Sequence, residues 1–503
     1  MGFGCNPQIQ PLPETMPAKV EATPPLAGLS PVAGKPLIAR FGGGQFSSDG
    51  GLLTLREVER RLGLAERLAA CIGDPRMPER VQHSVADIPR FRMLMIAAGY
   101  EDGNDADALR HDPVFKLALD QLPDGAALCS QPTISRLENL PKARELVRMA
   151  RAMVGLYCGS FRQVPRRIVL DVDDTFDAVH GEQQLRLFNA HYGEYGFQPI
   201  VVFDGEGRPV AAMLRPAKRP SGREASAFLR RLVREIRGHW PRVEILIRAD
   251  SHYCAPEAID FCRAERLDFI LGVASTTTLR RHVVALERST AARNAAAADG
   301  GKLRRYKEFH DGAASWSRVE RIIARVEAGP EGVDTRFVVT NLPGGSARTL
   351  YERGYCRRGQ AENHVKAWKR HLAADRTSCG RATANQFRLM LHTGAYWPLW
   401  SLRSLMPKRS TWRMAQFDTL RLRLVKLAAR VVAPKTRVML HLPSACPDQA
   451  IMRLALERLP RLVCRPPGRT PLPRLSTRNR EPRDPHPAAG TEAGAAHARR
   501  HNR

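Results

Sequence analysis

Residues 168–175, IVLDVDDT, place three aspartates directly after a short apolar run. A strand that ends in carboxylates suits two chemistries: one carboxylate attacks a phosphate, or several bind divalent cations through oxygen. A second stretch, VEILIRAD, places Asp250 at the end of another expected strand. If the two strands are neighbours in a sheet, Asp173 and Asp250 face one another at the same edge. Two carboxylates placed in this way predict a site for hard cations.

A third carboxylate of such a site usually comes from a helix beside the sheet, and the segment 355–369 offers Glu362. On an α-helix, with about 100° per residue, Glu362 shares one face with three other functional side chains. These are Tyr355, Arg358 and Lys369, and all four fall within roughly 60°, forming one stripe. A solvated helix surface is the ordinary alternative for this composition. As a face turned to metal and phosphate, the stripe would bind a cation with its glutamate and phosphates with its basic and phenolic groups.

The D-x-D-x-T order of the first cluster resembles the haloacid-dehalogenase-like hydrolases, in which Asp171 would be the nucleophile and Asp173 the acid/base. That family continues into a helical region, whereas this chain continues into an expected antiparallel hairpin, FQPIVVFDGEGRPVAAML. It also needs a later acidic pair at a strand end, and IRADSHY has a single aspartate. A phosphatase that uses Asp171 is therefore the lesser alternative.

The four residues of the stripe are separated by two, three and six residues, a spacing written Y-(2)-R-(3)-E-(6)-K. With LDVDDT, GEQQLRLFNAHYGEYGFQPIVVFD and IRADSHY around it, the chain resembles the DDE transposases with an RNase H-like catalytic core, in particular the branch numbered insertion-sequence family 1380. The resemblance covers roughly residues 40–463. It implies an enzyme of cut-and-paste DNA transposition, which cleaves DNA strands at transposon ends and transfers them into target DNA.

The resemblance also implies the roles of the residues. Asp173, Asp250 and Glu362 would be the catalytic residues and metal ligands, holding two Mg²⁺ ions about 3.5–4 Å apart, with Mn²⁺ able to substitute. Water would attack first, and the freed 3′-hydroxyl would attack in strand transfer. Tyr355, Arg358 and Lys369 would clamp DNA phosphates. The implied partners are terminal inverted repeats and target DNA, bound by a dimer in the bacterial cytoplasm at the nucleoid.

The choice of the first aspartate rests on the family pattern, which places it two residues before a threonine and so selects Asp173. Alternation along a strand puts Asp171 on the same face and Asp174 on the other. Asp171 is therefore the alternative ligand or a supporting group. His252, next to Asp250, has no HxxxH or Cys partner, and we expect a supporting role for it.

The composition agrees with a polyanionic partner. The 503 residues include 79 Lys and Arg against 51 Asp and Glu, a net charge of +28, which favours nucleic acid, although a merely basic or ribosome-associated protein would share it. The 10 cysteines form no CxxC pair, so neither a zinc framework nor a disulfide scaffold is expected, and a reducing cytosol fits. No apolar run reaches 18 residues, and we expect no membrane partner.

The elements that must position these residues predict an α/β fold: a mixed sheet flanked by helices, with a β-rich insertion and an N-terminal helical domain. The resemblance implies that the sheet is an RNase H-like core and that the insertion precedes the last catalytic helix. The expected divisions are a flexible leader (1–40), a helical DNA-binding domain (41–160), the first part of the core (161–276), the insertion (277–345), the second part of the core (346–410), a C-terminal segment (411–463) and a disordered basic tail (464–503).

Three further features are candidates for contact with DNA. The segment SQPTISRLENL predicts a helix that starts near Pro132 and would present Arg136, although a packed helix would begin in the same way. The loop RPAKRPSGRE (215–224) would follow a DNA backbone through Arg219 and its neighbours, unless it is an ordinary solvated loop. Trp316 is a candidate stacker for a flipped base, with a buried structural role as the alternative.

A transposase remnant that binds DNA ends without catalysis is the alternative from a different functional class. It would share the basic composition and the N-terminal helices, but the three carboxylates are all present, which favours the enzyme. The composition of the 464–503 tail keeps the remnant open, because a shifted reading frame near the end would produce such a tail.

Overall fold

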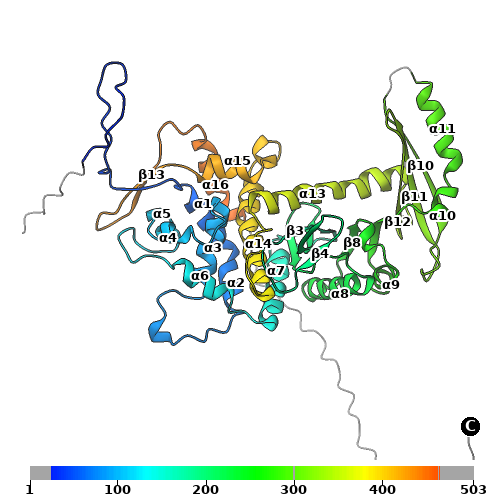
Figure 1. Ribbon diagram of the computed structural model, residues 1–503, viewed down its shortest axis with the longest axis horizontal. Coiled ribbons are helices and arrows are strands. Elements are labelled where there is room, and N and C mark those ends of the chain that lie inside the picture. The colour runs from blue at the N-terminus through cyan, green and yellow to red at the C-terminus, as the bar shows by residue number, and fades with distance from the viewer. Residues whose placement is uncertain (1–23, 298–300, 463, 465–503) are drawn as a thin grey trace, which may run out of the picture.

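The computed structural model describes residues 24–297, 301–462 and 464. Its centre is an eight-stranded mixed sheet in the order β10-β11-β12-β9-β8-β2-β6-β7, flanked by helices (Figure 1). The expectation of a mixed α/β sheet flanked by helices is thereby confirmed. The expected tail lies outside the described residues apart from Cys464, and most of the expected leader lies outside them as well.

The strands of the large sheet agree with the pattern of apolar runs and turn residues in the sequence. They are β2 (Arg167–Asp174), β6 (Ile200–Asp204), β7 (Pro209–Met213), β8 (Glu244–Ala249), β9 (Asp268–Val273), β10 (Leu303–Asp311), β11 (Glu320–Gly329) and β12 (Gly332–Thr340). The hairpin predicted around Asp204-Gly205-Glu206-Gly207 joins β6 to β7, and Gly207 adopts a positive φ of 81° in its turn. The β-rich segment expected near 277–345 contributes β10, β11 and β12, and β12 pairs with β9.

Strand β2 lies between a parallel and an antiparallel neighbour, β8 and β6. Val172 pairs with Ala249, so the next residue on each strand, Asp173 and Asp250, comes at the same edge of the sheet. Parallel neighbours are required for this arrangement, because only they bring two carboxyl ends together. The two apolar runs predicted that Asp173 and Asp250 lie at the same edge of the sheet, and the structure places them there.

The two faces of β2 are covered differently. Ile168, Leu170 and Val172 belong to the main hydrophobic cluster, whereas Val169 packs in a second cluster with Leu350 and Tyr351. This alternation puts the odd-numbered positions on the face that the 347–371 segment covers. Asp171 and Asp173 therefore share a face, as the sequence predicted.

The main-cluster side is covered by α7 (Ala143–Gly159), α8 (Gly222–His239) and α9 (Pro256–Ala264). Helix α8 was not among the predicted elements. It begins with a capping box, in which the Ser221 side chain accepts from the Glu224 N–H and Glu224 in turn accepts from the Ser221 N–H. Its apolar residues recur at helical spacing from Ala225 to Ile236 and are buried.

The other side is covered by one long helical segment, visible as the nearly horizontal helix labelled α13 in Figure 1. It runs through α12 (Ala347–Thr349), a π-helical turn (Leu350–Tyr355), a 3₁₀ turn (Cys356–Arg358), α13 (Gly359–Lys366) and a second π-helical turn (Ala367–His371). A regular α-helix over 355–369 was expected, and that expectation is wrong. The π turns close i→i+5 bonds, so they change which residues share a face.

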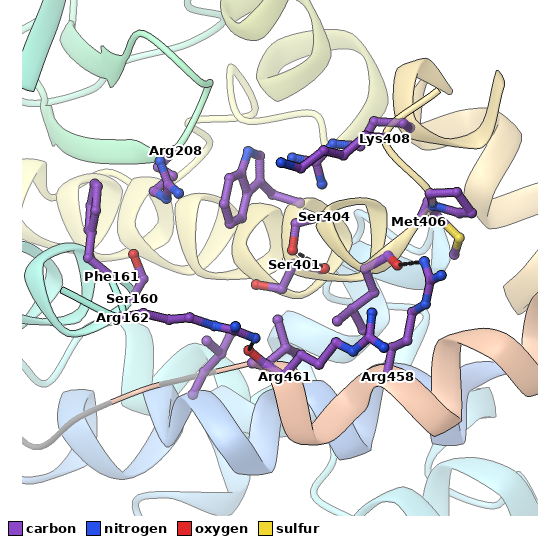
Figure 2. Close-up of a pocket in the computed structure, with 16 residues that line it drawn as sticks. Ser160, Phe161, Arg162, Arg208, Ser401, Ser404, Met406, Lys408, Arg458 and Arg461 are labelled. Atoms are coloured by element: carbon purple, nitrogen blue, oxygen red, sulfur yellow. Dashed lines mark hydrogen bonds between the residues drawn. The ribbon is translucent and has the colours of Figure 1, made fainter. Parts of the chain in front are cut away.

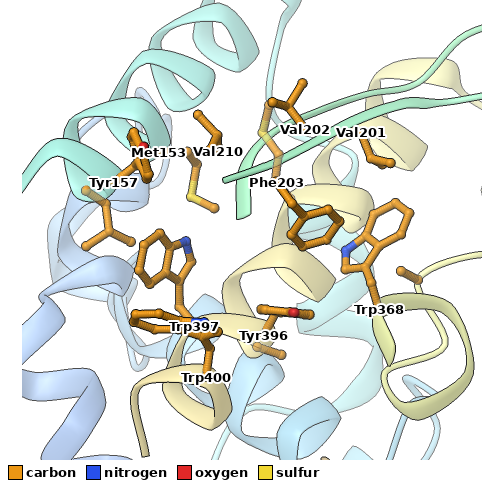
Figure 3. Packing of buried hydrophobic residues seen from close by; sticks show 14 of the residues in the cluster. Met153, Tyr157, Val201, Val202, Phe203, Val210, Trp368, Tyr396, Trp397 and Trp400 are labelled. Atoms are coloured by element: carbon orange, nitrogen blue, oxygen red, sulfur yellow. The ribbon is translucent and has the colours of Figure 1, made fainter. Parts of the chain in front are cut away.

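One half of the molecule is helical, and it contains the helices before β2 together with helix α14 (Ala382–Leu405). Around α14 pack α1 (Leu52–Leu62), α2 (Leu64–Ala69), α3 (Asp87–Ala98), α4 (Ala106–Leu109), α5 (Pro113–Ala118), α6 (Gln131–Glu138) and α7. Figure 3 shows Tyr396, Trp397 and Trp400 of α14 with Phe203 of β6 and Trp368 of the long helical segment. These side chains join the helical half and the sheet in one cluster, so the domain boundaries stay predictions.

Two three-stranded sheets complete the fold. One has the order β1-β13-β14 and joins β1 (Gln45–Ser47) to β13 (Ala429–Val432) and β14 (Met439–His441). The other, β3-β5-β4, consists of β3 (Asp177–Ala178), β5 (Glu194–Phe197) and β4 (Leu187–Asn189). The remaining helices are α10 (Thr277–Arg281), α11 (Val284–Ala295), α15 (Phe417–Leu420) and α16 (Gln449–Arg458). Among the described residues, no helix combines the length and apolarity that a membrane span requires.

Candidate active site

One guanidinium lies among the three carboxylates named from the sequence. Arg358 Nη2 donates to Asp173 Oδ1 at 3.1 Å and lies 3.9 Å from Asp250 Oδ2. Its Nη1 lies 3.7 Å from Glu362 Oε1, one helical turn further on. Arg358 is itself mostly buried, with 11% of its side chain exposed. The structure therefore brings Asp173, Asp250, Glu362 and Arg358 together at the sheet edge.

The environment of Asp173 disfavours its charge. Burial raises the pKa of Asp173 to about 7, with Asp250 and Asp174 raising it further and Arg358 lowering it. A neighbouring cation is what would restore the ionised form. A carboxyl with a raised pKa at an accessible sheet edge is typical of functional sites.

The other two aspartates of β2 are already satisfied by protein groups. Arg248 donates to both oxygens of Asp171, from Nε at 2.6 Å and Nη2 at 2.7 Å, in a buried bidentate pair. Asp174 accepts from Gln198 Nε2 at 2.9 Å and contacts the His252 ring at 3.2 Å. Asp171 is thus buried and paired through both oxygens, which disfavours its use as a phosphatase nucleophile. Asp174 holds neighbouring loops rather than facing the guanidinium of Arg358.

His252 contacts two of the aspartates, and its supporting role stays a prediction. Its backbone N–H donates to Asp250 Oδ1 at 2.9 Å, which fixes that carboxylate. Its ring contacts Asp174, and this hydrogen bond is the main cause that raises the pKa of His252. The residue therefore connects Asp250 to Asp174.

The donor set suits a hard divalent cation, because its three members are carboxylates and all approach one positive group. Asp173 and Asp250 lie within 4 Å of the same guanidinium nitrogen, and the Glu362 side chain is 69% exposed. Within the described part of the chain, no group of three or more His, Cys, Asp or Glu side chains is close enough to hold an ion as placed. As placed, the three carboxylates surround the Arg358 guanidinium instead of a site for an ion.

Tyr355 lies at the same edge, above Gly272 of β9. A Cβ added at Gly272 would lie 2.7 Å from the Tyr355 hydroxyl oxygen and 3.1 Å from the Ser251 backbone nitrogen. Only glycine allows this approach. Burial, with Asp250 and Asp173 nearby, raises the pKa of Tyr355, so its hydroxyl stays a proton donor.

Lys369 contacts the segment just after β2 instead of the three carboxylates. Its Nζ donates to the Phe176 carbonyl at 2.6 Å and to Thr175 Oγ1 at 3.2 Å, and it lies 2.9 Å from Asp177 Oδ1. Burial raises the pKa of Asp177 to about 7, and Lys369 lowers it. The second π turn contains Lys369, so the straight-helix arithmetic does not apply to it. The lysine therefore contacts residues that directly follow the strand that carries Asp173.

The other predicted DNA contacts lie at different places. Arg219 is exposed and donates to the Ser251 carbonyl at 2.6 Å, directly beside Asp250. Arg136 is exposed on the predicted helix α6, and its contact with DNA stays a prediction. Arg215, from the same basic loop as Arg219, is buried and donates to the carbonyls of Gln198 and Lys218. Trp316 packs, partly buried, against the main cluster.

A surface of exposed aromatic side chains was missed. Phe188, Tyr192 and Tyr195 lie on or beside the β3-β5-β4 sheet, each about half exposed, and Tyr192 stacks on Phe176 with ring centroids 4.2 Å apart. Phe176 is also the residue whose carbonyl Lys369 binds. Aromatic residues recurring along LFNAHYGEYGF were the available signal in the sequence.

Comparisons with known proteins show the family of the chain. A family model described as "Transposase DDE domain group 1" matches residues 29–464. No curated protein matches the chain. A solved chain titled "Cryo-EM structure of piggyBac transposase synaptic complex with hairpin DNA" is similar at 11% sequence identity and a TM-score of 0.36, over 81% of this chain and 82% of that one.

Proposed function

The chain belongs to the transposase DDE domain family, group 1, and on this premise we propose that it cuts DNA at transposon ends and joins them to target DNA with the help of divalent cations. The observation that carries this proposal is the arrangement of Asp173 and Asp250 at adjacent strand ends, with Arg358 between them and Glu362. Each of these residues was named from the sequence, and they converge from three separate parts of the chain.

The three carboxylates would hold the cations, Mg²⁺ or in its place Mn²⁺. Bound there, such ions lower the pKa of an attacking water and stabilise the leaving oxygen. The chain's own contribution is to fix two of the ligands: the Asp174 N–H donates to Asp173 and the His252 N–H donates to Asp250. Glu362 would supply the third carboxylate from the helical segment. Before cations bind, Arg358 compensates the charge of Asp173 and Asp250.

The basic and phenolic groups around the carboxylates would hold the DNA backbone. Arg358 and Tyr355 face the edge itself, Arg219 lies beside Asp250, and Lys369 lies beside the continuation of β2. Guanidinium groups bind phosphate oxygens through paired N–H donors. We assign Arg136 on α6 to a more distant part of the DNA, and the exposed aromatic surface around Tyr192 to stacking with bases.

We infer that β7-β6-β2-β8-β9 forms an RNase H-like core. Three antiparallel strands followed by two parallel ones, with carboxylates on the two central strands, support this assignment. Strands β10, β11 and β12 then form the β-rich insertion before the catalytic helical segment, and the helices of 41–160 form the region that recognises ends. By the same proposal, the protein acts as a dimer when it holds two transposon ends.

The test is a cleavage assay with the full chain and duplexes that carry its own terminal inverted repeats. Addition of Mg²⁺ should produce cuts at the transposon boundary, followed by joined products when target DNA is present. Chelation of the metal should stop both reactions. A protein that binds the ends tightly but never cuts them under these conditions would be the inactive remnant, and the proposal would fail.

A further inference from the structure

A basic cavity of about 560 Å³ lies where α14 ends, away from the carboxylates. Its lining comes from the segment after α7, the β6–β7 turn, the end of α14 with the loop that follows, and the C-terminal end of α16. Asp173 pairs with Val201 and Leu170 with Asp204, so the β6–β7 turn lies at the opposite edge of the sheet from Asp173. The cavity is therefore separate from the candidate active site.

The lining is positively charged on all sides. Figure 2 shows Arg162, Arg458 and Arg461 below Ser401 and Ser404, with Arg208 and Lys408 above them. No lining residue is acidic, and the six basic ones are Arg162, Arg208, Lys408, Arg413, Arg458 and Arg461. An excess of charge at this density requires compensation by an anion or by solvent.

Acidic partners are nearly absent around these residues. Arg208 pairs with Asp204 at 2.8 Å and with Glu206 at 3.0 Å. For the other five basic residues, the structure of residues 24–297, 301–462 and 464 contains no carboxylate within 4.0 Å. Burial lowers the pKa of Arg413, and Arg403 and Arg208 lower it further while Glu206 raises it. The cluster is thus short of negative charge.

Backbone contacts hold several of the guanidinium groups in position. Arg162 Nη2 donates to the Arg461 carbonyl at 2.9 Å, and Arg458 Nη1 donates to the Leu405 carbonyl at 2.8 Å. Arg413 Nη1 donates to the Arg403 carbonyl at 3.3 Å. Each guanidinium has five N–H donors, so these bonds position the group and leave other donors for a ligand.

The aromatic wall limits what the ligand can be. Arg208 lies over the ring of Phe161 at 4.3 Å and over that of Trp400 at 4.7 Å. Trp400 Nε1 donates to the Glu206 carbonyl, which fixes the indole. One face of each ring is therefore taken by an arginine. The cavity suits phosphate groups, which need donors and positive charge but no stacking partner.

We propose that this cavity binds phosphates of the DNA backbone at a contact separate from the cleavage site. The identity of DNA as the source of the phosphates rests on the proposed function. A free polyphosphate has the same chemistry and is the other source that the experiment must separate. The contact would anchor a stretch of duplex at the opposite edge of the sheet from the cut.

Salt dependence of DNA binding tests this proposal. The full-length double variant Lys408→Gln/Arg461→Gln removes two exposed charges from the lining. The control variant Arg409→Gln/Arg453→Gln removes two exposed charges outside the lining, Arg409 directly after Lys408 and Arg453 on α16. The logarithm of the DNA-binding constant falls linearly with the logarithm of the salt concentration. Each lost phosphate contact makes this line less steep by about 0.9. The lining variant should therefore lose about two units of slope relative to wild type, and the control variant should keep the wild-type slope.

Two outcomes would overturn the proposal. Equal slopes in the lining and control variants would show that the cavity makes no contact with the backbone. Binding of inorganic pyrophosphate that depends on Lys408 and Arg461 but does not compete with duplex would make a free anion the ligand. A protein that fails to bind its end DNA at all would instead refute the proposed function, so the two failures are distinguishable. Chemical denaturation of both double variants verifies that each is folded.

Discussion

The Nη2 atom of Arg358 lies 3.1 Å from Oδ1 of Asp173, so a buried guanidinium compensates a carboxylate whose pKa burial raises to about 7. The two residues are far apart in the sequence and come from a helical turn and a strand end. Their contact joins the two halves of the candidate site. The first prediction concerns this contact.

Arg358→Ala should lower the rate of end cleavage by about 100-fold, the usual cost of removing one preorganised charge from a phosphate-transfer site. The neighbouring Arg357 is exposed and is the matched control. Single-turnover cleavage of an end duplex measures both variants. Equal rates for Arg358→Ala and Arg357→Ala would contradict the assignment.

Gly272→Ala should displace Tyr355 and reduce cleavage, because the new Cβ would lie 2.7 Å from the tyrosine hydroxyl. In a Tyr355→Phe background that oxygen is gone, so the same substitution should cost less. A double-mutant cycle on cleavage rates measures the coupling. Additive effects of the two substitutions would show that the close approach has no role in the reaction.

Asp171→Asn should destabilise the fold by roughly 3–5 kcal/mol, because it leaves the buried Arg248 guanidinium without its carboxylate. Asp173→Asn should not lower the free energy of unfolding at pH 8, because burial already disfavours the ionised form of Asp173. Denaturant titration of the two variants provides the comparison. A large loss of stability in Asp173→Asn would instead assign this aspartate a structural role.

Asp177 should make the fold less stable as the pH rises. Burial raises its folded-state pKa to about 7, above the unfolded value, so the native state binds the proton more tightly. Its contribution is fully present below the unfolded pKa and is lost as the pH increases through about 7. Asp177→Asn should flatten this part of the stability profile between pH 4 and pH 8 relative to wild type, measured by denaturation. Asp124→Asn, at an exposed position, is the control, and an unchanged profile in Asp177→Asn would count against the account.

Much of the site could be predicted because local patterns determine it. The apolar runs before Asp173 and Asp250 fixed two strands, and alternation correctly placed Asp171 on the face of Asp173. Spacing alone could not show that Arg248 occupies Asp171, since that pair joins two strands 77 residues apart. This contact disfavours the phosphatase alternative, in which Asp171 would be the nucleophile.

Other features depend on packing that no sequence window contains. The π turns at Leu350–Tyr355 and Ala367–His371 moved Lys369 to Asp177, although a straight helix placed it in the Glu362 stripe. Helix α8 was missed because its first residues were assigned to the basic loop 215–224. Its apolar face repeats at helical spacing and is recognised only over many residues. The basic cavity could not be predicted either, because Arg162, Arg208 and Arg461 come from three distant segments.

The central claim is that Asp173, Asp250 and Glu362 together bind the cations that cut DNA. The direct measurement is Mg²⁺-dependent cleavage of an end duplex by Asp173→Ala, Asp250→Ala and Glu362→Ala, with binding to the same duplex measured in parallel. The exposed Glu457→Ala on α16 is the matched control.

The account predicts that all three variants lose cleavage and keep DNA binding, while Glu457→Ala retains both. Cleavage that survives in Asp173→Ala, with loss in a correctly folded Asp171 variant, would contradict it.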